Sequence, residues 1–105
     1  MAQRIIATAG TAEITDGSQV EFSLQAKHFR GGKRPVISVE GLVAAETVTW
    51  WFFTNGDFEE VDDGSGTQVS FTATHASDLF NGPGTYGFTK SVTVGAIVVT
   101  LNDGI

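Results

Sequence analysis

One run of eight residues constrains the fold of this chain more than any other segment: Thr-Val-Thr-Trp-Trp-Phe-Phe-Thr at positions 47–54, followed by Asn-Gly at 55–56. β-Branched and aromatic residues favour strands, and Asn-Gly favours a two-residue type I′ turn between paired strands. Because successive side chains of a strand point to opposite faces, only one face of this strand can enter a core. The predicted inward residues are Val48, Trp50 and Phe52. The predicted outward residues are Trp51 and Phe53.

A two-residue turn also determines which residues of the next strand lie beside these side chains. It places Phe53 opposite Phe58 and Trp51 opposite Glu60, so that Trp51, Phe53 and Phe58 share the outer face. Monomer surfaces rarely leave such a group uncovered, and aromatic residues often anchor protein interfaces. We therefore predict that these three side chains contact another subunit or a partner. Cover by a loop or by the N-terminal segment of the same chain is the alternative.

Short alternating runs separated by glycine turns continue along the rest of the chain. Strands are predicted at residues 4–8, 20–26, 36–40, 47–54, 58–61, 67–74, 85–90 and 96–101. Residues 75–80 could hold one short helical turn. This spacing predicts an all-β fold: an antiparallel, immunoglobulin-like β-sandwich of about eight short strands, formed by one domain over residues 1–105. The sequence leaves open whether residues 1–10 form an N-terminal arm that orders on binding.

Composition narrows the classes of partner. The chain has 105 residues, no cysteine and a net charge of −6. Without cysteine it has no disulfide, thiolate metal site or thiol nucleophile. The negative net charge argues against nucleic acid and against an anionic membrane surface as binding partners. No stretch approaches the length of about 18 apolar residues that spans a bilayer, and the start lacks the apolar run of a signal peptide, so synthesis in the cytoplasm is expected.

The segment after the Asn-Gly turn is rich in carboxylates. It carries Asp57, Glu59, Glu60, Asp62 and Asp63. Calcium takes several oxygen ligands, but the EF-hand spacing is absent, and a strand would divide these side chains between two faces. A solvated sheet edge that resists unwanted strand pairing is the preferred interpretation. A calcium site and a glycosidase acid–base pair are the alternatives.

A basic loop stands out in this acidic chain. It holds four of the six Lys and Arg residues: Lys27, Arg30, Lys33 and Arg34. Such charge asymmetry can steer docking to an acidic surface, including another copy of the chain, whereas a solvated loop is the alternative. The two histidines, His28 and His75, lie on separate loops, and nothing pairs either one with a nucleophile. We predict no enzymatic activity, no cofactor and no metal.

Two segments resemble small structural proteins of tailed bacteriophages. Residues 39–49, VEGLVAAETVT, resemble the pattern V-x-G-L-x-x-G-E-x-V-T of those proteins, and residues 81–90, NGPGTYGFTK, resemble N-G-P-G-x-Y-R-x-x-K. The chain departs from the family in its aromatic strand after Val48 and in Gly87, where an Arg is common. The resemblance implies an immunoglobulin-type sandwich that decorates capsids or serves as another virion accessory part, and it brings no catalytic residues.

These observations together predict a non-enzymatic structural virion protein, made in the host cytoplasm, and most simply a phage capsid decoration protein. Its expected partners are the major capsid protein or other virion subunits, and it is expected to form a homo-oligomer. The alternative is a glycan-binding module of a phage tail or surface fibre. In that case Trp51 would stack on sugar, and Asp57, Glu59 or Glu60 would accept hydrogen bonds from its hydroxyl groups.

Overall fold

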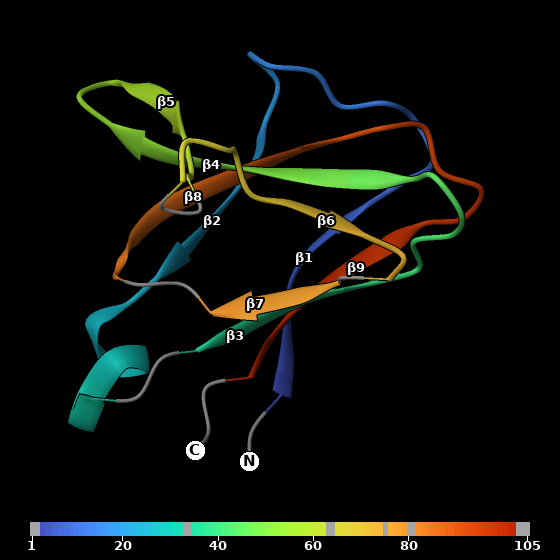
Figure 1. Cartoon of the computed structure of the whole chain (residues 1–105). Coiled ribbons are helices and arrows are strands. Elements are labelled where there is room, and N and C mark those ends of the chain that lie inside the picture. The colour runs from blue at the N-terminus through green and yellow to red at the C-terminus, as the bar shows by residue number, and fades with distance from the viewer. Residues whose placement is uncertain (1–2, 33–34, 63–64, 75, 80–81, 103–105) are drawn as a thin grey trace.

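The computed structural model describes residues 3–32, 35–62, 65–74, 76–79 and 82–102. Within them the chain forms nine strands and one 3₁₀ helix (Figure 1). The elements are β1 (Gln3–Ala9), β2 (Val20–Leu24), η1 (Ala26–Gly32), β3 (Val36–Glu40), β4 (Thr47–Thr54), β5 (Asp57–Glu60), β6 (Ser70–Thr72), β7 (Ser77–Leu79), β8 (Gly84–Lys90) and β9 (Ile97–Asn102).

The strands form two antiparallel sheets whose pairings are nested. One sheet has the order β1-β9-β3-β7, and the other has the order β2-β8-β4-β5, with β6 also pairing with β4. Thus β1 pairs with β9, β2 with β8, β3 with β7 and β4 with β5, so that each pair lies between the two strands of the preceding pair in the sequence. This is the strand order of a jelly roll, a double Greek key.

The predicted all-β antiparallel sandwich is confirmed, and its strand order is now defined. In an immunoglobulin sandwich the first two strands are neighbours in one sheet, whereas here β1 and β2 belong to different sheets. The term immunoglobulin-like therefore holds for the two packed layers and not for the order of the strands within them.

One local prediction is wrong, and one question that the sequence left open is answered in part. The segment predicted as a helical turn at 75–80 contains β7, because Ser77 and Leu79 pair with Ser38 and Val36 at the edge of a sheet. The sequence left open whether residues 1–10 form an arm, and in the structure residues 3–9 form β1 and pair with β9 along their length. Both outcomes arise from pairing with strands distant in sequence, which local patterns do not report.

The core is built around Trp50, whose side chain has 0% of its surface exposed. Its indole makes edge-on contacts with Phe22, Phe71 and Phe88, with ring centroids 5.7, 5.0 and 5.7 Å apart. These rings come from β2, β6 and β8, all in the same sheet as Trp50. The opposing sheet contributes the buried residues Ile37, Val39, Ile97, Val99 and Leu101. Of the residues predicted to point inward from β4, Val48 and Trp50 are fully buried and Phe52 packs partly buried against the core.

The first residue of β8, Gly84, has to be glycine. Gly84 has φ +147°, and a Cβ there would lie 2.6 Å from Cε1 of Phe52. Phe52 in turn packs edge-on against Tyr86, with ring centroids 5.0 Å apart. The glycine therefore allows the aromatic strand to pass close to the start of β8.

Tyr86 fastens Gly82, just before β8, to the sheet. Its buried hydroxyl donates a hydrogen bond of 2.8 Å to the backbone carbonyl of Gly82, four residues upstream. Burial raises the pKa of this hydroxyl above 10.0. The folded state therefore favours the protonated tyrosine, and the stability that it contributes is complete below pH 10.0 and lost as the pH rises through the raised pKa.

Tyr86→Phe tests this bond because it keeps the ring and removes the hydroxyl. The variant should lose about 1 kcal/mol of unfolding free energy at pH 7, and its stability should fall less than that of the parent chain above pH 10. Urea denaturation across this pH range measures both effects. Ser23→Ala is the matched control, since the Ser23 hydroxyl contacts Thr85 at an exposed site and should matter little. A Tyr86→Phe variant as stable as the Ser23→Ala control would contradict the assignment.

Candidate functional site

The three predicted outer-face aromatic residues lie together on the outer face of the β2-β8-β4-β5 sheet. We call Trp51, Phe53 and Phe58 the aromatic patch. The hairpin register is as predicted, with Phe53 opposite Phe58 and Trp51 opposite Glu60. The rings of Phe53 and Phe58 meet edge-on, 5.1 Å apart. Phe53 is 40% exposed, and the other two side chains are half-buried, so the same chain covers the patch only in part.

Gly87 provides the space into which Phe58 folds. A Cβ at this position would lie 2.7 Å from Cε1 of Phe58 and 2.9 Å from Cβ of Gln19. Gly87 is also the β8 partner of Trp51. The glycine that stands where the resembling proteins commonly have Arg is therefore explained by the aromatic patch, because any side chain here would displace the Phe58 ring.

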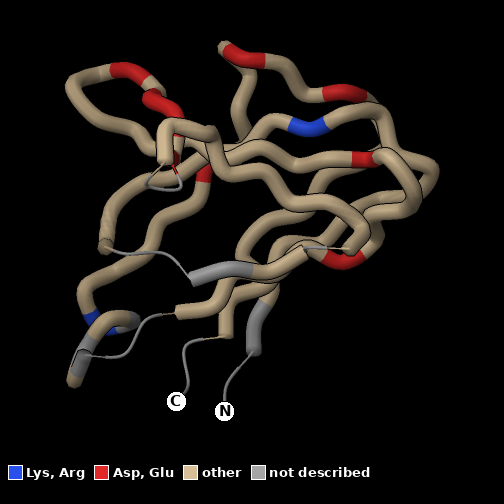
Figure 2. The backbone as a smooth tube through the Cα atoms, viewed as in Figure 1, with Lys and Arg blue, Asp and Glu red and all other residues tan. Residues whose placement is uncertain are grey.

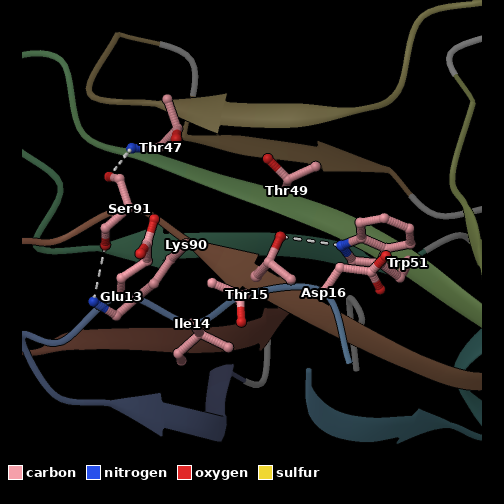
Figure 3. A pocket seen from close by; sticks show the side chains of 10 residues that line it. Glu13, Ile14, Thr15, Asp16, Thr47, Thr49, Trp51, Lys90 and Ser91 are labelled. Carbon is pink, nitrogen blue, oxygen red and sulfur yellow. Dashed lines mark hydrogen bonds between the residues drawn. The ribbon is translucent and has the colours of Figure 1, made fainter. Parts of the chain in front are cut away.

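A groove with a volume of about 380 Å³ lies beside Trp51 on the same sheet face. Its floor carries hydroxyl groups from β4, β8 and the residue that follows β8: Thr47, Thr49, Thr89 and Ser91. One wall is the segment 13–16, which carries Glu13 and Asp16. Figure 3 shows Trp51 at one end of the groove and Thr47 and Ser91 at the other. Sequence reasoning did not detect this groove, because its wall comes from the connection between β1 and β2.

Hydrogen bonds hold both the wall and the end of the groove in place. Ile14 and Lys90 exchange two backbone hydrogen bonds of 3.0 Å, which fasten the connection alongside the end of β8. The Asp16 carboxylate accepts a bond of 2.7 Å from the Gln19 side chain. The indole N–H of Trp51 donates to Oγ1 of Thr89 at 3.1 Å, as Figure 3 shows. The groove is therefore formed without any ligand.

Lys90, which also lines the groove, is a buried cation that feels the negative charge of Glu46. Lys90 is 3% exposed, and its ammonium donates to the Ser91 carbonyl at 3.2 Å and to the Thr93 hydroxyl at 3.1 Å. Burial lowers the pKa of Lys90, and the negative charge of Glu46 partly opposes this. The Lys90 charge therefore opposes folding below its lowered pKa, and this cost disappears as the pH rises toward 10.5.

Glu46 joins two loops at one end of the sandwich. Its carboxylate accepts hydrogen bonds from the backbone N–H of Val43 at 2.8 Å and of Val94 at 2.7 Å. These loops present three strongly exposed apolar side chains, Val43 at 53%, Val92 at 66% and Val94 at 83%. They lie at the end of the sandwich opposite the tip of the β4–β5 hairpin (Figure 1). Single valines gave no signal in the sequence, since isolated exposed apolar residues are normal.

The acidic hairpin is divided between two faces, as strand geometry requires. Glu60 shares the outer face with Trp51, whereas Asp57 and Glu59 alternate to the other side. Asp57 bonds the backbone N–H of Phe58, and Asp62 bonds that of Gly66, while Asp63 lies outside the described residues. Among the residues that the structure describes, no three His, Cys, Asp or Glu side chains are grouped as metal ligands.

The described part of the basic loop is η1, which lies apart from the β4–β5 hairpin. Lys27 is exposed on η1, and Arg30 belongs to the same helix, but the Arg30 side chain and both Lys33 and Arg34 lie outside the description. Figure 1 places η1 away from the β4–β5 hairpin, and Figure 2 shows basic positions at η1 and acidic positions along β5. The described part of the basic segment and the acidic hairpin therefore lie in different regions of the molecule.

The described part of the chain contains no helix that is both long and apolar enough to cross a membrane. Comparisons with protein-family models, with curated proteins and with solved structures find no match to this chain.

Proposed function

We propose that this chain is a non-enzymatic structural virion protein, most simply a capsid decoration protein that binds its partner through the aromatic patch. The observation that carries the proposal is the exposed ring of Phe53, which meets the Phe58 ring edge-on across the hairpin and shares a face of β4 with Trp51. Folding alone does not require this exposed ring, because the core already contains five buried aromatic residues: Phe22, Trp50, Phe71, Tyr86 and Phe88.

The sheet suits a contact that is repeated many times with the same shape. Gly87 lets Phe58 lie close to the sheet, and the Thr89 hydroxyl holds the Trp51 indole, so both rings are ordered before binding. Little conformational entropy is then lost when they dock. Jelly rolls are common among viral capsid domains, which agrees with the proposal, although a fold by itself does not specify a function.

The basic loop is proposed as a second, electrostatic contact. Lys27, Arg30, Lys33 and Arg34 would steer docking toward an acidic surface of the capsid or of a neighbouring copy. Because η1, the helix that carries Lys27 and Arg30, lies away from the β4–β5 hairpin, this contact would involve a different subunit or a different region. Self-association is part of the proposal, and light scattering of the purified chain over a range of concentrations would detect it.

Phe53→Ser is the sharpest test of the aromatic patch. The side chain is exposed, so the variant should stay folded, yet its affinity for undecorated capsids should fall about tenfold or more. Co-sedimentation with those capsids measures the binding, and thermal denaturation checks the fold. The matched control is Val94→Ser, which removes a more exposed apolar side chain at the other end of the sandwich.

Two results would reject attachment through this patch. Phe53→Ser could bind capsids as tightly as the parent chain, or Val94→Ser could reduce binding while Phe53→Ser does not. The second result would assign the contact to the loops that carry Val43, Val92 and Val94.

A further inference from the structure

We propose that the groove beside Trp51 binds a short neutral oligosaccharide. This inference goes beyond attachment through the aromatic patch and does not depend on it. It gives the sugar-stacking alternative a specific location, between β4, β8 and the segment 13–16. Of the carboxylates first considered for that alternative, only Glu60 shares the outer face with Trp51.

The chemistry of the lining selects a ligand that both donates and accepts hydrogen bonds. The floor presents the hydroxyl groups of Thr47, Thr49, Thr89 and Ser91, each of which can donate or accept. The wall presents the Glu13 and Asp16 carboxylates, which are acceptors when ionised. The many hydroxyl groups of a sugar can satisfy both kinds of partner, and the Trp51 ring offers an apolar surface for the C–H face of a sugar.

The length of the groove suits more than one sugar ring. Thr47, Thr49 and Trp51 lie at alternate positions on one face of β4. The four residue steps from Thr47 to Trp51 extend about 13 Å along the strand. Trp51 stands at one end of this row (Figure 3). A short chain could therefore place one ring near the indole and the next ring over the threonines.

Anionic ligands are disfavoured by the charges along the groove. The wall is negative, and the only cation among the lining residues is Lys90. Its ammonium donates to the Ser91 carbonyl and to the Thr93 hydroxyl, so two of its three N–H donors are already bonded within the protein. A phosphate, a sulfated sugar or a nucleic acid would therefore meet repulsion without a compensating partner.

Cationic ligands would gain little from this arrangement. Glu13 and Asp16 are exposed on the wall, where water and salt screen their charges. Ion pairs at such positions contribute weakly to affinity. A hydroxyl floor adds nothing that an ammonium or guanidinium group specifically needs, because such groups carry donors alone.

The test is titration of the parent chain with a panel of neutral oligosaccharides, followed by calorimetry and by NMR shifts of backbone amides. At least one sugar should bind saturably and shift the amides of Thr49, Thr89 and Asp16. Thr49→Val and Asp16→Asn should each weaken binding about three- to tenfold, because the first removes a hydroxyl group and the second replaces a charged acceptor oxygen with an amide NH2. Trp51→Ala should weaken it further.

Matched controls keep the result interpretable. Thr85 lies on β8 outside the groove, and Glu59 lies on the other face of β5. The Thr85→Val and Glu59→Gln variants should therefore bind the sugar as tightly as the parent chain does. Thermal denaturation of every variant separates lost binding from lost folding. Phe53→Ser should lose capsid attachment but keep sugar binding, whereas Thr49→Val should show the reverse, so the failure of one proposal is distinguishable from the failure of the other.

Three results would overturn the site. The first is the absence of saturable binding by any neutral sugar in the panel. The second is binding that Glu59→Gln weakens and Thr49→Val leaves unchanged. The third is saturable binding of lysine- or arginine-containing peptides in the groove without binding of sugars, which would assign it to a cationic ligand.

Discussion

Trp50→Ser is expected to unfold the domain under conditions in which Trp51→Ser remains folded. Trp50 is completely buried among Phe22, Phe71 and Phe88, so its loss leaves a large cavity. Removing a buried Trp costs about 3–5 kcal/mol, and burying a new hydroxyl adds about 1–3 kcal/mol. Domains of this size have only about 5–15 kcal/mol of stability, so Trp50→Ser removes most of it.

Trp51→Ser should behave differently because Trp51 is half-buried on the outer face. It loses part of its packing and the hydrogen bond to Thr89, for a cost of about 1–2 kcal/mol. Its capsid or self-association should fall more than its folding stability does. Urea denaturation of both variants, with co-sedimentation of any that fold, makes the comparison. Equal losses of stability with assembly intact would show that the two faces of β4 have been assigned incorrectly.

Gly41→Ala is expected to be the second most damaging substitution. Gly41 has φ +105°, and a Cβ there would lie 2.7 Å from the backbone oxygen of Ala96. That oxygen belongs to the residue that precedes β9, so it cannot move without disturbing β9. Backbone strain and overpacking each cost about 1–3 kcal/mol, which gives a total loss of about 2–6 kcal/mol.

Gly17→Ala is the matched control for this prediction. Gly17 also has a positive φ, +97°, but a Cβ there would meet nothing within 4 Å. It should therefore lose only the strain component, about 1–3 kcal/mol. Thermal or urea denaturation of both variants separates the cost of backbone strain from the cost of overpacking. If Gly41→Ala is no less stable than Gly17→Ala, the close approach between Gly41 and Ala96 is not a real constraint on the fold.

Most of the strands follow from local patterns. The predicted strands at 36–40 and 47–54 match β3 and β4 residue for residue, and the Asn-Gly turn gives the observed register of β4 with β5. The reason is that β-branched and aromatic alternation between glycine turns leaves few other conformations. Asn55 adopts φ +53° and Gly56 φ +81°, as a type I′ turn requires.

Other elements depend on contacts that a local pattern does not contain. The segment 67–74 is a strand only over Ser70–Thr72, because pairing with β4 ends there. η1 forms in the connection predicted as a basic loop, and β7 forms only because β3 offers a free edge. Short segments with weak propensity take the structure that their neighbours in space impose.

The candidate site shows the same division. The aromatic patch was predictable, since alternation along β4 and the two-residue turn place its three residues on one face. The groove was not, because Glu13 and Asp16 reach it only through the pairing of Ile14 with Lys90, 76 residues later. No local spacing relates those positions.

The sequence alone therefore determined most of the strands of this protein, the two faces of β4 and the register of one hairpin. These follow from steric preferences that act over a few neighbouring residues. The tertiary structure alone decided three features: the jelly-roll order of the strands, the meeting of the two loops that carry Val43, Val92 and Val94, and the groove beside Trp51. Each of these arises where segments far apart in the chain meet, and such meetings are selected by the burial of the whole core and not by any one segment.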